Sequence, residues 1–200
     1  MSGPTFLPES AAALAFSPRL EDARAAVIDV EDVEADPVKA RICSLLDTRP
    51  RPLDRAERPG HLTGSALVVD HQARRTLVML HAKLGIWVQP GGHADGNANL
   101  AAVALREATE ETGIGGLRVW SRAIDLDIHV VDPPGEDAHE HHDVRFLVVA
   151  PAGAVEIPNH ESRELRWVTE DELTILGVDP GLARLARRGF ALAAGVGDGA

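Results

Sequence analysis

Tyrosine is absent from this 200-residue chain, and aromatic residues make up only 4% of it. The single cysteine, Cys43, can form no disulfide within the chain and cannot build a cysteine cluster for a metal. This usage is typical of a reducing compartment, so we expect the protein in the cytoplasm and Cys43 as a small apolar side chain in the interior.

Long apolar runs and an excess of basic charge are also missing. No run approaches the roughly 20 residues that a membrane-spanning helix needs, and residues 11–16 are too few for the apolar part of a signal peptide. The 20 lysines and arginines face 31 aspartates and glutamates, which gives a net charge of −11. We therefore expect neither a membrane nor a nucleic-acid polymer as partner, and an anionic substrate would need a bound cation.

The residues that are present indicate one globular domain with extensions, since 44% are hydrophobic and 26% charged. Residues 1–59 alternate short apolar clusters with proline and charge, and they are predicted to form an N-terminal extension with one helix. That helix would begin at Asp36 and Pro37. Residues 60–195 are predicted to form the main domain, and residues 196–200 a frayed tail.

Strand and helix patterns alternate through the main domain. The predicted strands cover residues 64–69, 76–80, 86–88, 117–120, 123–131 and 144–150. The predicted helices cover residues 100–112, a short stretch after a capping box at Thr169 and Glu172, and residues 180–191. Asn99 and Gly113 suit the two ends of the first of these helices, whereas the proline-glycine-glycine run at 90–92 should end a strand. An α/β fold with a mixed β-sheet is predicted.

Three carboxylates gather on one side of the helix predicted over residues 100–112. Glu107 and Glu111 are one turn apart, and Glu110 lies three residues after Glu107. Arg106 can pair with Glu110, but one guanidinium does not neutralise three carboxylates. Taken alone, the cluster fits either a solvated acidic helix face or a site for Mg²⁺ or Mn²⁺, hard cations that prefer oxygen ligands.

The surrounding residues resemble the box of the Nudix hydrolase family, G-x5-E-x7-R-E-U-x-E-E-x-G-U, in which U is a bulky aliphatic residue. The matching positions are Gly92, Arg106, Glu107, Glu110, Glu111, Gly113 and Ile114. The resemblance extends over about residues 64–173. It implies a Nudix-type α/β/α sandwich with a mixed β-sheet.

Two positions depart from the pattern. Ala98 stands where the family has its first glutamate, and Ala108 is smaller than the usual aliphatic residue. The change at Ala98 removes a carboxylate, which would lower activity, move the proton-transfer role elsewhere or abolish catalysis. Asp95 and His93, in the same loop, are candidates to replace it.

The resemblance implies roles for the box residues. Glu107, Glu110 and Glu111 would bind the divalent cations, the latter two as catalytic residues, and Arg106 would orient the glutamates as a further catalytic residue. The backbone carbonyl of Gly91 is a candidate metal ligand.

A general base is still needed, and loops often carry such groups. Glu161, before Trp167, is the first candidate and Glu164 the second, although each also fits an ordinary surface carboxylate.

A histidine-rich run precedes the last predicted strand. If the strand begins early, His139, His141, Asp143 and Arg145 share one sheet face. His141, Asp143 and Arg145 are then candidates for substrate binding, with Arg145 suited to a phosphate. A zinc site and a solvated loop are the alternatives; the run lacks the H-E-x-x-H pattern. His61 has no partner that the sequence identifies.

The family's activity is hydrolysis of a nucleoside diphosphate linked to another moiety. The resemblance therefore implies an Mg²⁺- or Mn²⁺-dependent hydrolase that cleaves a diphosphate linkage in a small phosphorylated, nucleotide-like substrate. The alternative is a Nudix-fold nucleotide-binding or regulatory domain with reduced catalysis. In that case, Ala98 would mark the loss of a catalytic glutamate. The sequence does not specify the oligomeric state, and a homodimer is left open.

Overall fold

The computed structural model describes residues 4–31, 36–132 and 135–197 of the chain. Its helices are α1 (Leu20–Ile28), α2 (Asp36–Thr48), α3 (Leu100–Thr112), α4 (Glu170–Leu176) and α5 (Pro180–Gly197), with a 3-10 helix at Ala12–Leu14. Its strands are β1 (Phe6–Pro8), β2 (Gly60–Val69), β3 (Thr76–His81), β4 (Trp87–Val88), β5 (Gly91–His93), β6 (Arg118–Val131), β7 (His139–Val149) and β8 (Ser162–Val168). No helix within the three described ranges is long and apolar enough to cross a membrane.

The strands form a single sheet in the order β1-β6-β7-β2-β3-β4, with β5 paired to β2 and β8 paired to β3. Strands β2 and β7 run parallel, from Gly60 opposite Glu140 to Val69 opposite Val149. The other pairings are antiparallel. The predicted mixed sheet is therefore confirmed.

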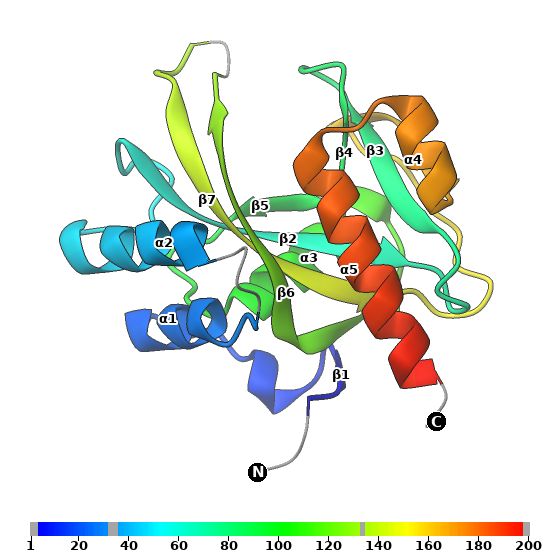
Figure 1. Cartoon of the computed structure of the whole chain (residues 1–200), viewed down its shortest axis with the longest axis horizontal. Coiled ribbons are helices and arrows are strands. Elements are labelled where there is room, and N and C mark those ends of the chain that lie inside the picture. Colours follow the sequence, from blue (N-terminus) through cyan, green and yellow to red (C-terminus); the bar gives the residue numbers. More distant parts are fainter. Residues whose placement is uncertain (1–3, 32–35, 133–134, 198–200) are drawn as a thin grey trace.

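Helices cover both faces of this sheet, with α5 in front and α3 behind in Figure 1. Successive residues of a strand point to opposite faces. On one face, Leu62 and Phe146 pack into a core that includes residues of α1, α2 and α3. On the other face, Leu67 and Leu147 pack against α5 residues such as Leu185. The result is the predicted α/β/α sandwich.

Local chemistry fixes the ends of α3. The Asn99 side chain accepts a 3.3 Å hydrogen bond from the Ala102 amide, and Gly113 adopts the left-handed conformation with φ of 67°. A glycine tolerates this φ because it has no Cβ. Thr169 and Glu172 also form their predicted capping box at the start of α4. The carboxylates of α3 are thus held on a helix with well-defined ends.

The proline-glycine-glycine run ends β4 at Val88, as predicted, but its glycines begin a second short strand that was not predicted. Gly91–His93 forms β5, in which Gly91 lies opposite Ser65 of β2 and Gly92 opposite Gly64. The two backbones approach so closely that a Cβ on Gly91 would lie 2.3 Å from the Ser65 hydroxyl oxygen. The short strand forms because it pairs with β2, and local strand propensity does not predict such a tertiary pairing.

The N-terminal region contains more structure than the one helix predicted for it. Besides α2, it forms α1, whose N-cap Arg19 provides no side-chain hydrogen bond and whose buried residues are only Ala23 and Val27. Its sequence signal is therefore weak. At the other end, α5 extends beyond the predicted residue 191 to Gly197. The domain division at residue 60 stays a prediction, and residues 198–200 of the expected tail lie outside the described residues.

Candidate active site

The last two turns of α3 carry the acidic cluster beside β5. Glu111 is 5% exposed, and its Oε2 accepts a 2.8 Å hydrogen bond from the Gly91 amide. Glu107 is partly buried and lies against Gly92, whereas Glu110 is exposed. The box helix and the glycine strand therefore meet at two carboxylates, with the third at the edge towards solvent.

The position of Glu107 depends on the glycine that opens the box. A Cβ added at Gly92 would lie 2.5 Å from the Glu107 carboxyl carbon, closer than van der Waals contact allows. Arg106 donates hydrogen bonds to Glu107 and, at 3.0 Å, to the carbonyl of His93. This guanidinium thus links the helix to β5 and holds one carboxylate, and its predicted role in orienting metal ligands stays a prediction.

The loop before β8 brings a fourth acid to the cluster. The Asn159 amide donates to the Glu110 carbonyl at 3.1 Å and accepts from the Glu161 backbone N–H at 2.8 Å. The Ile157 N–H donates to the carbonyl of Thr112 at 2.7 Å. These bonds fix the loop to the end of α3, where the side chain of Glu161 hydrogen-bonds Glu111.

Burial and like charge oppose ionisation in this cluster. Burial raises the pKa of Glu111 to about 9; the Gly91 amide offsets part of the increase, and Glu161 and Glu107 add to it. Burial also raises the pKa of Glu107, and the pairing with Arg106 offsets only part of this increase. Among the described residues, no basic side chain forms a salt bridge with Glu111. Such a group of acids fits a divalent cation, which would replace the missing positive charge.

A model of the NUDIX domain matches residues 61–189, more than half of the chain. The chain belongs to the NUDIX domain family. In sequence it is 39% identical over 101 residues to a Mycobacterium tuberculosis protein named "Putative 8-oxo-dGTP diphosphatase 3". That match covers 50% of this chain and 44% of the relative, so the chain spans less than half the length of the relative it matches.

Solved structures show the same Nudix architecture. A Nudix hydrolase from M. smegmatis, RenU, superposes with a TM-score of 0.51 at 26% identity, covering 68% of this chain and 88% of that one. A C. elegans Ap4A hydrolase superposes with a TM-score of 0.55 at 16% identity, covering 67% and 98%. The latter likeness concerns the fold alone. The predicted Nudix-type sandwich is confirmed by these neighbours.

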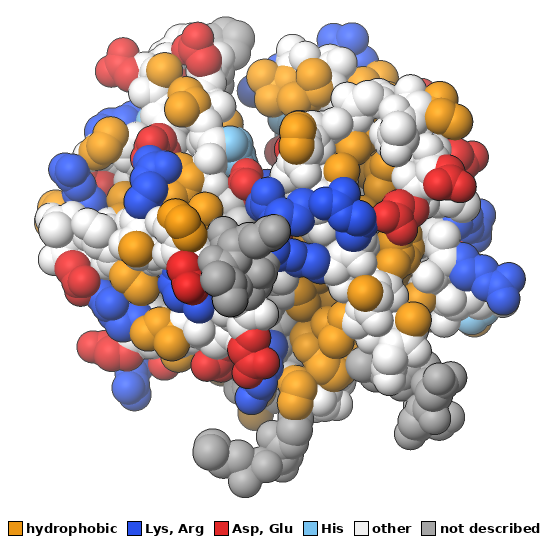
Figure 2. Space-filling view, in the orientation of Figure 1, with side chains coloured by type: hydrophobic (Ala, Val, Ile, Leu, Met, Phe, Trp, Pro, Cys, Tyr) orange, Lys and Arg blue, Asp and Glu red, His pale blue; other side chains and the backbone are white. Residues whose placement is uncertain are grey.

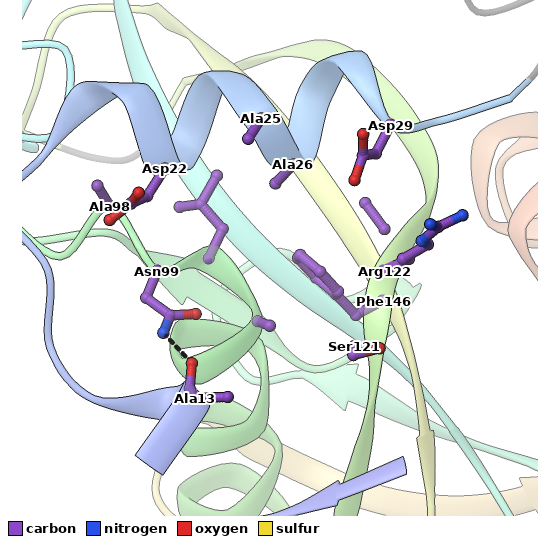
Figure 3. Close-up of a pocket in the computed structure, with 13 residues that line it drawn as sticks. Ala13, Asp22, Ala25, Ala26, Asp29, Ala98, Asn99, Ser121, Arg122 and Phe146 are labelled. Carbon is purple, nitrogen blue, oxygen red and sulfur yellow. Dashed lines mark hydrogen bonds between the residues drawn. The ribbon is translucent and has the colours of Figure 1, made fainter. Parts of the chain in front are cut away.

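The missing box glutamate is explained by its surroundings. Ala98 is fully buried, and its amide donates a 2.6 Å hydrogen bond to the carbonyl of Ser17 in the N-terminal segment. It lines a pocket of about 370 Å³ between α1 and the start of α3. Figure 3 shows Asp22 of α1 beside it, and the Ser17 hydroxyl donates to that carboxylate. Residues of the N-terminal region therefore line the pocket that a glutamate at this position would enter.

Two of the other acids predicted to take part in catalysis, one as a substitute for the box glutamate and one as a general base, have partners of their own. Asp95 pairs with Arg55 through two hydrogen bonds. Glu164 accepts 3.0 and 2.6 Å hydrogen bonds from Arg166 on β8. Of the two candidate bases, Glu161 is the one in contact with the acidic cluster. Its role as a base, like the roles of the box glutamates, stays a prediction.

The residues predicted to contact substrate on β7 form a buried ionic network. Arg145 is 2% exposed and donates to Asp143 at 2.8 Å and to Asp127 at 2.9 Å. Arg184 of α5 donates to Asp125 and Asp127 at 3.0 Å, and basic side chains gather along α5 in Figure 2. Burial alone would lower the pKa of Arg145, but the aspartates outweigh it and raise the pKa. The network ties α5 to the sheet, and substrate binding by Asp143 and Arg145 stays a prediction.

His141, the third predicted substrate contact, lies on the same sheet face as Arg145, on β7. The structure places it beside His61 of β2, in register. Sequence reasoning missed this pairing because the two residues are 80 positions apart and meet only through the parallel alignment of β2 and β7.

Proposed function

We propose that this chain is a divalent-metal-dependent pyrophosphohydrolase that cleaves a diphosphate linkage in a nucleotide-like substrate. The observation that carries the proposal is the meeting of Glu107, Glu111 and Glu161 beside the glycine strand. Arg106 pairs with Glu107, but no basic side chain of the described residues forms a salt bridge with Glu111. Membership of the NUDIX domain family supports it.

Mg²⁺ or Mn²⁺ fits these donors. The site offers carboxylate oxygens from Glu107, Glu110 and Glu111 and the nearby carbonyl of Gly91, the hard oxygen ligands that these cations prefer. The observation that supports the fit is the burial of Glu111 among other acids, with no salt bridge to it in the described part of the chain. When bound, such cations neutralise diphosphate charge and lower the pKa of a coordinated water.

The residues of this chain have separate tasks in the proposed reaction. Arg106 holds Glu107 in place through its hydrogen bond. The Gly91 amide fixes one oxygen of Glu111 beside the other acids of the cluster. Glu161, on its fixed loop, accepts the proton that the attacking water loses. The chain thus supplies positioning and one proton acceptor.

The substrate class is narrowed by the mycobacterial relative, whose name assigns 8-oxo-dGTP hydrolysis to that protein. We propose a nucleoside triphosphate with a modified base as the first substrate to examine. The expected products are a nucleoside monophosphate and pyrophosphate. Location in the cytoplasm and a homodimeric state stay predictions.

A substrate panel tests the proposal. Purified full-length protein is incubated with 8-oxo-dGTP, the standard nucleoside triphosphates, ADP-ribose, a dinucleoside polyphosphate and a non-nucleotide diphosphate, with Mg²⁺ or with chelator. Metal-dependent release of phosphate products from at least one compound, lost in Glu110→Gln, supports the proposal. A nucleotide that raises the melting temperature without turnover of any compound overturns it in favour of a binding domain.

A further inference from the structure

Five histidines gather on one face of the sheet. His61 of β2 lies opposite His141 of β7, which in turn lies opposite His129 of β6. His139 precedes His141 by two residues and therefore points to the same face, and His93 of β5 lies beside His61, with ring centroids 5.0 Å apart. Parallel pairing of β2 with β7 brings distant parts of the sequence into one imidazole cluster.

Three of these rings could share one ion. His61, His139 and His141 each offer a nitrogen, and the three nitrogens lie within 4.8 Å of one another. The centroid of the His61 ring is 5.0 Å from those of His139 and His141. Tetrahedral coordination with Zn–N bonds of about 2.0–2.1 Å places ligand nitrogens about 3.4 Å apart, so the nitrogens would need to move together by at most about 1.4 Å.

The hydrogen bonds of these rings leave nitrogens without partners. His61 is 0% exposed, and its Nε2 atom is buried without a hydrogen bond, as is Nε2 of His141. A buried polar atom without a partner is costly, and a bound ion is one of the ordinary ways in which proteins satisfy such an atom. Two such atoms from paired residues on neighbouring strands point to a shared ligand.

Backbone carbonyls orient two of the rings in the way that metal ligands are usually held. The Nδ1 of His139 lies 2.7 Å from the carbonyl of Asp137, and the Nδ1 of His61 lies 3.4 Å from the carbonyl of Glu57. A ring that donates its Nδ1–H to a carbonyl keeps the Nε2 lone pair for a metal. Donation from Nδ1 would leave Nε2 as the available nitrogen of both rings.

Burial favours the neutral form of two of the three rings, which is the form that binds a metal. Burial lowers the pKa of His61 to about 4, with further lowering by His93, and burial likewise places the pKa of His141 far below its usual range. Neutral imidazole is a preferred ligand of Zn²⁺ and of neighbouring transition metals, and less so of Mg²⁺. Figure 2 shows pale-blue histidine atoms in the hollow beside the β6–β7 hairpin.

We propose that His61, His139 and His141 form a binding site for a transition-metal ion of the Zn²⁺ class, separate from the carboxylate site on α3. His93 or a water would complete the coordination. This set contains nitrogen donors only, whereas the α3 site offers oxygens, so the two sites differ in the ions that they prefer. The proposal does not depend on hydrolase activity.

Metal binding to untagged, chelator-treated protein tests the site. Zn²⁺ is titrated by calorimetry into wild type, into His61→Gln/His141→Gln and into a control, His71→Gln, which removes an exposed histidine of the β2–β3 turn. We expect one tight Zn²⁺ site in wild type and in the control. In the double variant the dissociation constant for Zn²⁺ should rise by more than about 100-fold. Loss of a residue that only hydrogen-bonds a metal ligand typically costs about 10- to 100-fold.

Two further measurements separate this site from the carboxylates and from misfolding. Glu107→Gln/Glu111→Gln should keep the tight Zn²⁺ site, and X-ray absorption of the wild-type zinc complex should show nitrogen ligands. Absence of tight binding in wild type, equal binding in the double variant and wild type, or a zinc shell of oxygens would each overturn the proposal. Because the readout is metal binding, loss of turnover has no bearing on it.

Discussion

The main-chain amide of Gly91 donates a 2.8 Å hydrogen bond to the carboxylate of Glu111. This bond connects the short strand β5 to the last turn of α3 and fixes one acid of the cluster in the interior. Gly92, the next residue, leaves space for the carboxyl group of Glu107. The two glycines therefore allow Glu107 and Glu111 to take their positions beside β5.

Replacing Gly92 by alanine should reduce turnover without unfolding the protein. The new Cβ would lie 2.5 Å from the Glu107 carboxyl carbon, and this flexible side-chain end can move aside. A displacement of about 1 Å can cost roughly 100-fold in rate, so we expect kcat/KM to fall by at least 10-fold. Steady-state kinetics at saturating Mg²⁺ measures the effect.

Two other glycines provide the comparison. Gly115→Ala meets no atom within 4 Å and should leave both activity and stability unchanged. Gly91→Ala would place a Cβ 2.9 Å from the Ser65 Cα and should lower the unfolding free energy by about 1–3 kcal/mol. Wild-type turnover in Gly92→Ala would show that the position of Glu107 is unimportant.

Removing the buried guanidinium of Arg145 should destabilise the fold strongly. In Arg145→Met, the carboxylates of Asp143 and Asp127 would lose a partner in the interior. We expect a loss of about 3–5 kcal/mol in urea unfolding. Arg166→Met removes an exposed pair with Glu164 and should cost at most about 1 kcal/mol. Equal losses in the two variants would mean that the network contributes little.

Local signals in the sequence predicted the parts of the fold that depend on local chemistry. The ends of α3 follow from Asn99 and Gly113, and the start of α4 follows from the capping box at Thr169. By contrast, β5 was missed because its glycines form a strand only through pairing with β2. Helix α1 was missed because it has no capping side chain and buries small residues.

The candidate site also contains residues that the sequence predicts and contacts that it does not predict. The acids of α3 could be found from spacing along one helix, and Glu161 from its place in a loop. The partners of Asp143 and Arg145 could not, because Asp127 comes from another strand and Arg184 from α5. The histidine cluster likewise depends on strand register, which the sequence does not fix.

Placing the family's glutamate at position 98 should lower the stability of this protein and should not raise its activity. Ala98 is fully buried, and Ser17 connects it to Asp22. In Ala98→Glu, a carboxylate would enter a site beside another acid, and we expect a loss of about 1–3 kcal/mol with no gain in kcat. Adding Asp22→Asn should recover part of the stability in thermal unfolding. Unchanged stability together with higher kcat would contradict this explanation of Ala98.

Asp70 should make stability depend on acid pH. Burial alone would raise the pKa of Asp70, but hydrogen bonds from the Arg74 and Arg75 amides and from the Arg75 side chain outweigh it, so the pKa is lowered. Its contribution is therefore present above the unfolded-state pKa of about 4 and is lost as pH falls through the lower folded-state value.

Urea unfolding of wild type and Asp70→Asn between pH 7 and pH 3 measures this contribution. The variant keeps an acceptor for the amides but lacks the charge. Its stability deficit should be largest at neutral pH and should shrink towards pH 3. A deficit that does not change with pH would show that the charge of Asp70 is not involved.

Turnover by Glu111→Gln, measured with and without Mg²⁺, tests the central claim most directly. Glutamine keeps an acceptor for the Gly91 amide and replaces an acid whose pKa burial raises, so metal-free stability should change by less than about 1 kcal/mol. Glu170→Gln, on the exposed first turn of α4, serves as the control. The account predicts that Mg²⁺-dependent kcat/KM falls by at least about 100-fold in Glu111→Gln and is unchanged in Glu170→Gln. Equal Mg²⁺-dependent turnover in both variants would contradict it.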